Sequence, residues 1–231
     1  MKFLTLLACF AGLCRALAAP ELLLPGDSMS AWRDSRGWMT ACRVALVQTG
    51  GQQFVIAPGA GILVNGEQGR AADLVSREVF GDAQFHVEFC IPRHSNSGVY
   101  LMGRYEVQIY DSFGVVKDKY PGLECGGIYP RYDSQRHEYE GHSPAENVSR
   151  PPGLWQCFDI TFQAPRFDAH GRKTENARIL KVIHNGRLVQ ENVELTGPTH
   201  GGYEGEKPAG PLRLQGNHGP VAYRNLRITP L

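Results

Sequence analysis

Polar side chains that could carry out acid–base chemistry concentrate in one stretch, Asn96–Asp111. Alternate residues of a strand share a face, so Glu106 and Gln108 are expected to lie side by side. A carboxylate and an amide are costly to bury without partners, which favours a ligand-facing surface. A solvated outer face explains the alternation equally well. Strict alternation points Asp111 away from the face that carries Glu106.

A second cluster, His137–His142, has the composition of a metal site without its spacing. It reads His-Glu-Tyr-Glu-Gly-His, whereas a helical zinc site requires H-E-x-x-H. The cluster lies in the longest irregular stretch, from about Ser112 to Pro152. Such a stretch is typical of a binding loop or lid, with a surface excursion as the alternative. We expect no metal ligands in this cluster.

Short β-strands are the elements that must position these groups. The chain has 27 glycines and 15 prolines, and the segments between them alternate with period two. Asn185-Gly186 accepts the positive φ values of a type I′ turn, which predicts a β-hairpin. Further alternating segments flank a turn at 216–220, and none shows a sustained helical stripe. Many short strands joined by Gly/Pro turns indicate a sandwich or barrel, with strands expected at 85–91, 157–162, 179–183, 188–193, 211–215 and 221–228.

Composition excludes several classes of partner. The 231 residues carry 24 Lys+Arg and 23 Asp+Glu, a formal charge of +1, so charge alone gives no attraction to nucleic acid or to anionic membranes. A hydrophobic content of 42% is enough for a substantial core. No repeat, low-complexity tract or linker interrupts the sequence, which favours one compact domain.

The N-terminus is typical of a secretory signal peptide over residues 1–18. Lys2 supplies the positive region, Phe3–Leu13 the apolar region, and Ala16-Leu17-Ala18 the cleavage site. The apolar run is too short to span a bilayer, so we expect no membrane insertion after signal removal. The mature chain would begin at Ala19 and form a single domain over residues 19–231, secreted or periplasmic.

Removal of the signal would leave four cysteines in an oxidising compartment: Cys42, Cys90, Cys125 and Cys157. Four cysteines allow three disulfide pairings, and the sequence does not choose among them. Buried free thiols are at least as compatible with the sequence. No C-x-x-C spacing is present among them, so a zinc ribbon or a thioredoxin-type motif has no support.

Five runs of sequence resemble the 3-keto-disaccharide hydrolase family. They are NSGVYLMGRYEVQIYDS, ECGGIY, SRPPGLWQCFDITFQAPRFD, VIHNGRLVQENVELTGPT and GPLRLQGNHGPVAYRNLRI, and together they cover nearly the whole mature chain in order. The resemblance implies an all-β fold, a concanavalin A-like jelly-roll β-sandwich of two antiparallel sheets.

The resemblance also implies a site. Laminarinase-type glycosidases of this architecture carry E-x-D-x-x-E on a strand, with a bulge that places the last carboxylate, and residues 106–111 look like a variant, E-x-Q-x-x-D. The likeness therefore predicts a β-bulge or strand end near Tyr110 that turns Asp111 inward. By this resemblance, proton transfer or ion coordination falls to Glu106, Asp111 and His218. The candidates for contact with the sugar are Tyr100, Arg104, Gln108 and Gln215. A divalent metal ion is a possible cofactor, although no spacing demands one.

Two carboxyl groups about 5 Å apart define a retaining glycosidase, and Gln108 between the candidates makes that reaction the weaker interpretation. The family name implies cleavage of a 3-keto-glycoside by elimination or net hydrolysis instead. A carbohydrate-binding, lectin-like module on the same fold is the alternative, and an interaction domain of an envelope complex is a third. The sequence leaves the sugar, the linkage and the oligomeric state open.

Overall fold

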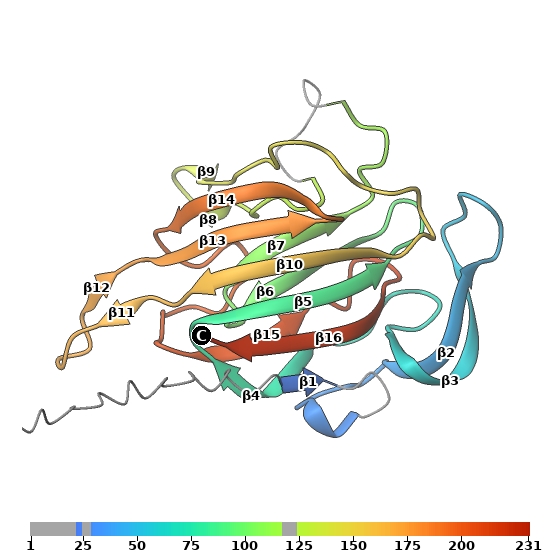
Figure 1. Cartoon of the computed structure of the whole chain (residues 1–231), viewed down its shortest axis with the longest axis horizontal. Helices are drawn as coiled ribbons and strands as arrows, with labels where there is room; N and C mark the ends of the chain where they lie inside the picture. Colours follow the sequence, from blue (N-terminus) through green and yellow to red (C-terminus); the bar gives the residue numbers. More distant parts are fainter. Residues whose placement is uncertain (1–21, 25–28, 117–123) are drawn as a thin grey trace, which may run out of the picture.

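The computed structural model describes residues 22–24, 29–116 and 124–231 (Figure 1). The predicted signal peptide, residues 1–18, and the predicted mature start at Ala19 lie outside these described residues. Two antiparallel sheets pack face to face, with a short 3-10 turn, η1 (Met29–Ala31), before the first long strand. The all-β jelly-roll prediction is confirmed. No helix in the described part is long and apolar enough to cross a membrane.

The larger sheet has eight strands in the order β14-β13-β10-β5-β16-β3-β2, and β1 pairs beside β16. The strands next to one another in this sheet are often distant in sequence, because the chain crosses between the two sheets as in a jelly roll. The strand bounds are β1 Leu22–Leu24, β2 Met39–Leu46, β3 Phe54–Val64, β5 Ala83–Cys90, β10 Gln156–Gln163, β13 Ala177–His184, β14 Arg187–Leu195 and β16 Ala222–Pro230.

The smaller sheet has four strands in the order β4-β15-β6-β7, and Figure 1 shows it behind the larger one. Two additional hairpins, β8–β9 and β11–β12, extend from the sandwich. The bounds are β4 Leu74–Phe80, β6 Asn96–Leu101, β7 Tyr105–Tyr110, β8 Arg131–Asp133, β9 His137–Tyr139, β11 Arg166–Phe167, β12 Lys173–Glu175 and β15 Gly210–Leu214.

The inward-facing side chains of both sheets form one apolar core. Its largest members come from both layers and are almost fully buried, and alternation then turns the residues between them outward. The smaller sheet contributes Val99, Leu101, Val107 and Ile109, and the larger sheet contributes Phe85, Phe89, Phe158 and Phe162. The outer face of the smaller sheet therefore receives Tyr100, Glu106 and Gln108.

The hairpin prediction is confirmed. β13 and β14 are joined by Asn185 and Gly186, whose φ angles are 50° and 83°, the positive values that a type I′ turn needs. The stretch from Ser112 to Pro152 is more ordered than predicted where it is described. It contains β8 and β9, and Ile128 bridges Val107 at the edge of the smaller sheet. Cys42, Cys90, Cys125 and Cys157 are free thiols.

Candidate functional site

A row of three side chains crosses the outer face of the smaller sheet. The register pairs Arg213 of β15 with Tyr100 of β6, and Tyr100 with Glu106 of β7. Residues directly opposite in neighbouring strands project to the same face, so these three side chains contact one another in a row that crosses the strands. The Arg213 guanidinium lies 3.8 Å from the centre of the Tyr100 ring, and the Tyr100 hydroxyl hydrogen-bonds Glu106.

The Glu106 carboxyl is held over a residue that has no side chain. Gly98 of β6 lies beside Gln108 of β7, and a Cβ added at Gly98 would lie 2.7 Å from the Glu106 carboxyl carbon. With its amide nitrogen facing the acceptors, Gln108 donates to Glu106 Oε1 at 3.2 Å and to the Ser97 carbonyl at 2.9 Å. Glycine at position 98 therefore makes the space that this carboxyl group occupies.

Glu106 is 2% exposed, and this burial determines its charge. Burial raises the pKa of the Glu106 carboxyl from its ordinary 4.5 to about 8, against the hydrogen bond from Tyr100 and the charge of Arg213, which lower it. The carboxylate of Asp73 raises it further. Burial and the nearby Glu106 also raise the pKa of the Tyr100 hydroxyl. At neutral pH, Glu106 is therefore mostly protonated and Tyr100 is a hydrogen-bond donor.

Glu106 and Tyr100 belong to a pocket of about 220 Å³. This volume is below the roughly 300–1,000 Å³ typical of drug-sized ligand sites, so it suits one sugar ring. The lining combines two amides, two hydroxyls, two imidazoles and one carboxyl group. Its residues are Asn96, Tyr100, Glu106, Tyr129, His200, Gly201, Gln215 and His218.

The turn that carries His218 is fixed from below by buried polar contacts. The amide of Asn65 donates to the carbonyls of Gly216 at 2.9 Å and Gly219 at 2.8 Å, and its oxygen accepts from the Val221 N–H at 2.7 Å. His218 itself is exposed, and its Nδ1 lies 2.5 Å from Asn217 Oδ1. Because Nδ1–H donates to that oxygen, the lone pair of a neutral His218 ring is on Nε2.

Two further lining residues reach the pocket on loops. Tyr129 follows Ile128, which bridges the edge strand β7, and its N–H donates to the Glu106 carbonyl at 3.1 Å. His200 is held by its N–H, which donates to the Pro130 carbonyl at 2.8 Å. The ring of His200 stacks on Tyr132 with centroids 4.7 Å apart. These contacts join segments distant in sequence, so no local pattern signals them.

Four of the seven residues predicted from sequence line this pocket: Tyr100, Glu106, Gln215 and His218. Gln108 lies beside it and contacts Glu106. Gln215 places a buried Oε1 without a hydrogen-bond partner in the described structure, as expected of an atom that accepts from a ligand hydroxyl.

Arg104 and Asp111 lie elsewhere. The Arg104 guanidinium donates to the carbonyls of Gly205 at 2.9 Å and Met102 at 2.8 Å, so it fastens the loop that follows β14 to the β6–β7 turn. β7 does end at Tyr110, as predicted, but Asp111 Oδ2 accepts from the His94 N–H at 2.9 Å and is not among the pocket residues.

Among the described residues, no three His, Cys, Asp or Glu side chains group closely enough to hold a metal ion.

Comparison with known proteins shows the family and the fold of the chain. The profile of the 3-keto-alpha-glucoside-1,2-lyase-like domain matches residues 19–229. The chain belongs to this family. The resemblance predicted from the sequence is thus confirmed, and the family supports a carbohydrate-active role with a carbohydrate ligand. No curated protein matches the chain closely enough to count as a relative.

Solved structures similar to this family member share its fold. Three are candidate glycosyl hydrolases of Parabacteroides distasonis. One is 23% identical with a TM-score of 0.59, covering 98% of this chain and 100% of that one. A second is 15% identical with a TM-score of 0.56, covering 89% and 91%. The third is 19% identical with a TM-score of 0.51, covering 74% and 87%.

Alanine at position 98 is expected to displace the catalytic candidate. The added Cβ of Gly98→Ala overlaps the Glu106 carboxyl group, which is buried and cannot move freely. Overpacking of this kind costs about 1–3 kcal/mol of unfolding free energy. We expect that loss in a urea titration, with a change in ligand binding. Gly81→Ala is the control, because its nearest non-neighbour atom is at 3.3 Å. Equal stability of the two variants would contradict the packing argument.

Arg213 is expected to set the titration of Glu106. Its positive charge lowers the pKa of that carboxyl, so Arg213→Met should move the titration to a pH above about 8. Arg213→Lys keeps the charge and should leave the pKa near the native value. The measurement is a ¹³C NMR titration of the labelled Glu106 carboxyl. An unchanged midpoint in the Met variant would show that Arg213 does not act on Glu106.

Proposed function

We propose that this chain cleaves the glycosidic bond of a 3-keto-glycoside by elimination, with water addition giving net hydrolysis where it follows. The observation that carries the proposal is a buried, mostly protonated Glu106 sharing one pocket with the imidazole of His218, whose Nδ1 is engaged by Asn217. An acid and a base in one ring-sized pocket are what elimination requires. Membership of the lyase-like family supports the choice of a 3-keto substrate.

The chemistry follows from the ketone. A carbonyl at C3 acidifies the C2 proton, and His218 Nε2 is the group assigned to remove it. The electron pair left on C2 is delocalised into the C3 carbonyl as an enolate and then forms the C1–C2 double bond while the C1–O bond breaks. Glu106 gives its proton to the departing oxygen. A protonated carboxylic acid at neutral pH suits this role, because the leaving alkoxide is strongly basic.

Neutral groups of the pocket position the ring. The amides of Asn96 and Gln215 offer hydrogen bonds to the enolate oxygen and to ring hydroxyls. The Tyr100 hydroxyl donates its proton to Glu106, and its oxygen is left to accept from a ring hydroxyl. The unpartnered Gln215 Oε1 accepts from one sugar hydroxyl. Each of these groups is fixed by the sheet or by the anchored turn, which favours pre-organised binding.

The deciding experiment incubates residues 19–231 with a chromogenic 3-keto-glucoside and with its unoxidised parent glucoside. Release of the leaving group from the keto substrate alone supports elimination. Release from both indicates an ordinary glycosidase. Binding of the sugars without release from either would support the function of a lectin-like carbohydrate-binding module and contradict that of an enzyme.

We also propose export of the chain to a secreted or periplasmic location. The support is the sequence of residues 1–18, and the family match begins at residue 19. Edman sequencing of the protein recovered outside the cytoplasm should begin at Ala19. An N-terminus at Met1 in that fraction would contradict signal cleavage.

A further inference from the structure

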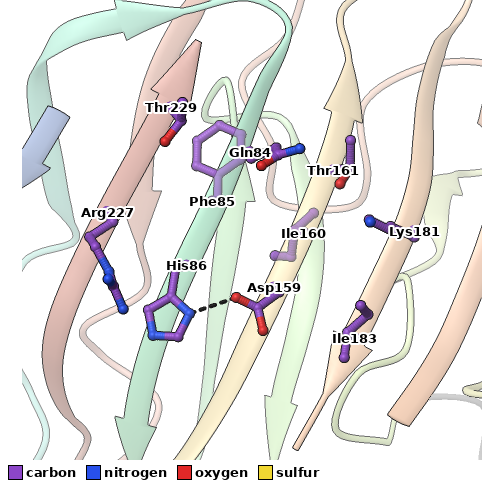
Figure 2. Close-up of a pocket in the computed structure, with 10 residues that line it drawn as sticks. All are labelled: Gln84, Phe85, His86, Asp159, Ile160, Thr161, Lys181, Ile183, Arg227 and Thr229. Atoms are coloured by element: carbon purple, nitrogen blue, oxygen red, sulfur yellow. Dashed lines mark hydrogen bonds and ion pairs between the residues drawn. The ribbon is translucent and has the colours of Figure 1, made fainter. Parts of the chain in front are cut away.

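A second hollow lies on the outer face of the larger sheet, the layer that does not carry the candidate pocket. Figure 2 shows this outer groove, of about 330 Å³, crossing β13, β10, β5 and β16. Side chains from all four strands form it, so it is a built feature of the sheet. Its lining is Gln84, Phe85, His86, Asp159, Ile160, Thr161, Lys181, Ile183, Arg227 and Thr229.

The strand register arranges the outward side chains of the groove in two parallel rows. One row runs Thr229, Gln84, Thr161, Lys181, and the other runs Arg227, His86, Asp159, Ile183. Each row spans three strand spacings, about 14 Å, and the rows lie about 7 Å apart. These are the dimensions of a short oligosaccharide lying across the strands.

The carboxylates in and beside the groove, Asp159 and Glu88, already have hydrogen-bond partners in the chain. Asp159 Oδ1 lies 2.6 Å from His86 Nδ1, and Figure 2 shows this contact on the floor of the groove. Glu88 is 3.7 Å from His86 Nε2, but its oxygens accept from Arg224 at 2.6 Å and Asn225 at 2.7 Å. A ligand carboxylate or sulfate therefore meets carboxylates that are already hydrogen-bonded, and Glu88 is also paired with an arginine.

Positive charge stands at opposite corners of the two rows. Lys181 has no carboxylate within ion-pair distance among the described residues. In Figure 2 its amine points toward Thr161, and the Arg227 guanidinium points toward His86. Gln84, Thr161 and Thr229 place an amide and two hydroxyls between these cations. Cations at the ends and neutral donors and acceptors between them match a sugar chain that bears anionic groups.

We propose that the outer groove binds an acidic saccharide, one whose rings carry carboxylate or sulfate groups. The saccharide lies across β13, β10, β5 and β16. Lys181 and Arg227 bind its anionic groups, and Gln84, Thr161 and Thr229 bind its hydroxyls. The site is separate from the pocket of Glu106 and does not depend on the reaction proposed there.

Isothermal titration calorimetry with three tetrasaccharides tests the proposal: a galacturonate, a sulfated galactan and neutral cellotetraose. The intact chain should bind one or both acidic sugars more tightly than the neutral one, and more weakly as salt is added. Lys181→Gln with Arg227→Gln should weaken that binding by about tenfold or more, since two charge-assisted contacts are lost.

Arg43→Gln with Lys207→Gln is the matched control, because it removes the same charge from two exposed positions outside both pockets. It should leave the affinity near that of the intact chain. Equal weakening by both double variants would show nonspecific charge attraction and overturn the site. Equal affinity for cellotetraose would overturn the anionic requirement. Release from the keto-glucoside should be unchanged in Lys181→Gln with Arg227→Gln, so a failure here is distinguishable from failure of the proposed enzyme.

Discussion

Glu106→Gln is expected to reduce cleavage of a 3-keto-glucoside by about 10²- to 10⁴-fold, the usual contribution of a positioned acid or base. Glutamine has the shape of the protonated carboxyl group but cannot transfer a proton. The substrate affinity should change little, because at neutral pH the native Glu106 is also mostly uncharged. The measurement is kcat and KM for the chromogenic substrate, with folding checked by circular dichroism.

The pH dependence identifies which proton-transfer role Glu106 has. As an acid with a pKa of about 8, it should give a native kcat/KM that falls as the pH rises through 8. A rate that instead rises through 8 would make Glu106 the base. Asp111→Asn is the matched carboxyl-to-amide control and should cost less than about tenfold, because Asp111 bonds the His94 N–H outside the pocket. A large loss in that variant would return Asp111 to the catalytic set.

Stability offers a readout that needs no substrate. The folded-state pKa of Glu106 is raised above its unfolded value, so the folded chain holds a proton that the unfolded chain releases above about 4.5. The unfolding free energy contributed by this group is present in full at low pH and is lost as the pH rises toward about 8. Glu106→Gln should therefore lose less stability than the native chain between pH 5 and about 8. If the unfolding free energies of the two proteins changed with pH in parallel, that would contradict the raised pKa of Glu106.

Local chemistry explains which parts of the fold the sequence could predict. The Asn185-Gly186 turn depends on φ values that those two residues accept, so the β13–β14 hairpin follows from a short window. Period-two alternation likewise places Glu106 and Gln108 on one face of β7. Neither pattern indicates whether the face of β7 that carries Glu106 and Gln108 meets solvent or a ligand. That choice depends on Gly98 across the sheet and on the loops of Tyr129 and His200, which are contacts distant in sequence.

The two predicted site residues that lie elsewhere show the same limit. Arg104 lies in the turn before β7 and is predicted from the sequence to contact the sugar, yet its guanidinium donates to carbonyl groups of that turn and of the 196–209 loop. Asp111 follows the predicted strand end, but the direction of its side chain is set by the His94 N–H in another loop. Sequence periodicity gives the face of a strand; it does not give the partner of a residue beyond the strand's end.

The second large effect is expected at Gly69, which lies under the turn of His218. A Cβ added there would overlap the carbonyl carbon of Gly219 and the nitrogen of Pro220, and Gly69 has a φ of 62°. Both obstacles are backbone atoms, so rotation of a side chain cannot relieve them. The turn is also held by Asn65, which resists any shift. Gly69→Ala should therefore lower the unfolding free energy by about 2–5 kcal/mol, the sum of backbone strain and overpacking.

Gly66→Ala separates these two causes. Gly66 has a φ of 78°, but its nearest non-neighbour atom is 3.6 Å from an added Cβ, so only the backbone strain of about 1–2 kcal/mol applies. Urea unfolding of both variants should show the larger loss at position 69. Because the displaced backbone carries His218, cleavage should fall in Gly69→Ala under conditions where it is still folded and remain near native in Gly66→Ala. Equal activity in the two variants would mean that the placement of His218 by this turn does not matter to the reaction, and the base would have to be sought among the other residues of the pocket.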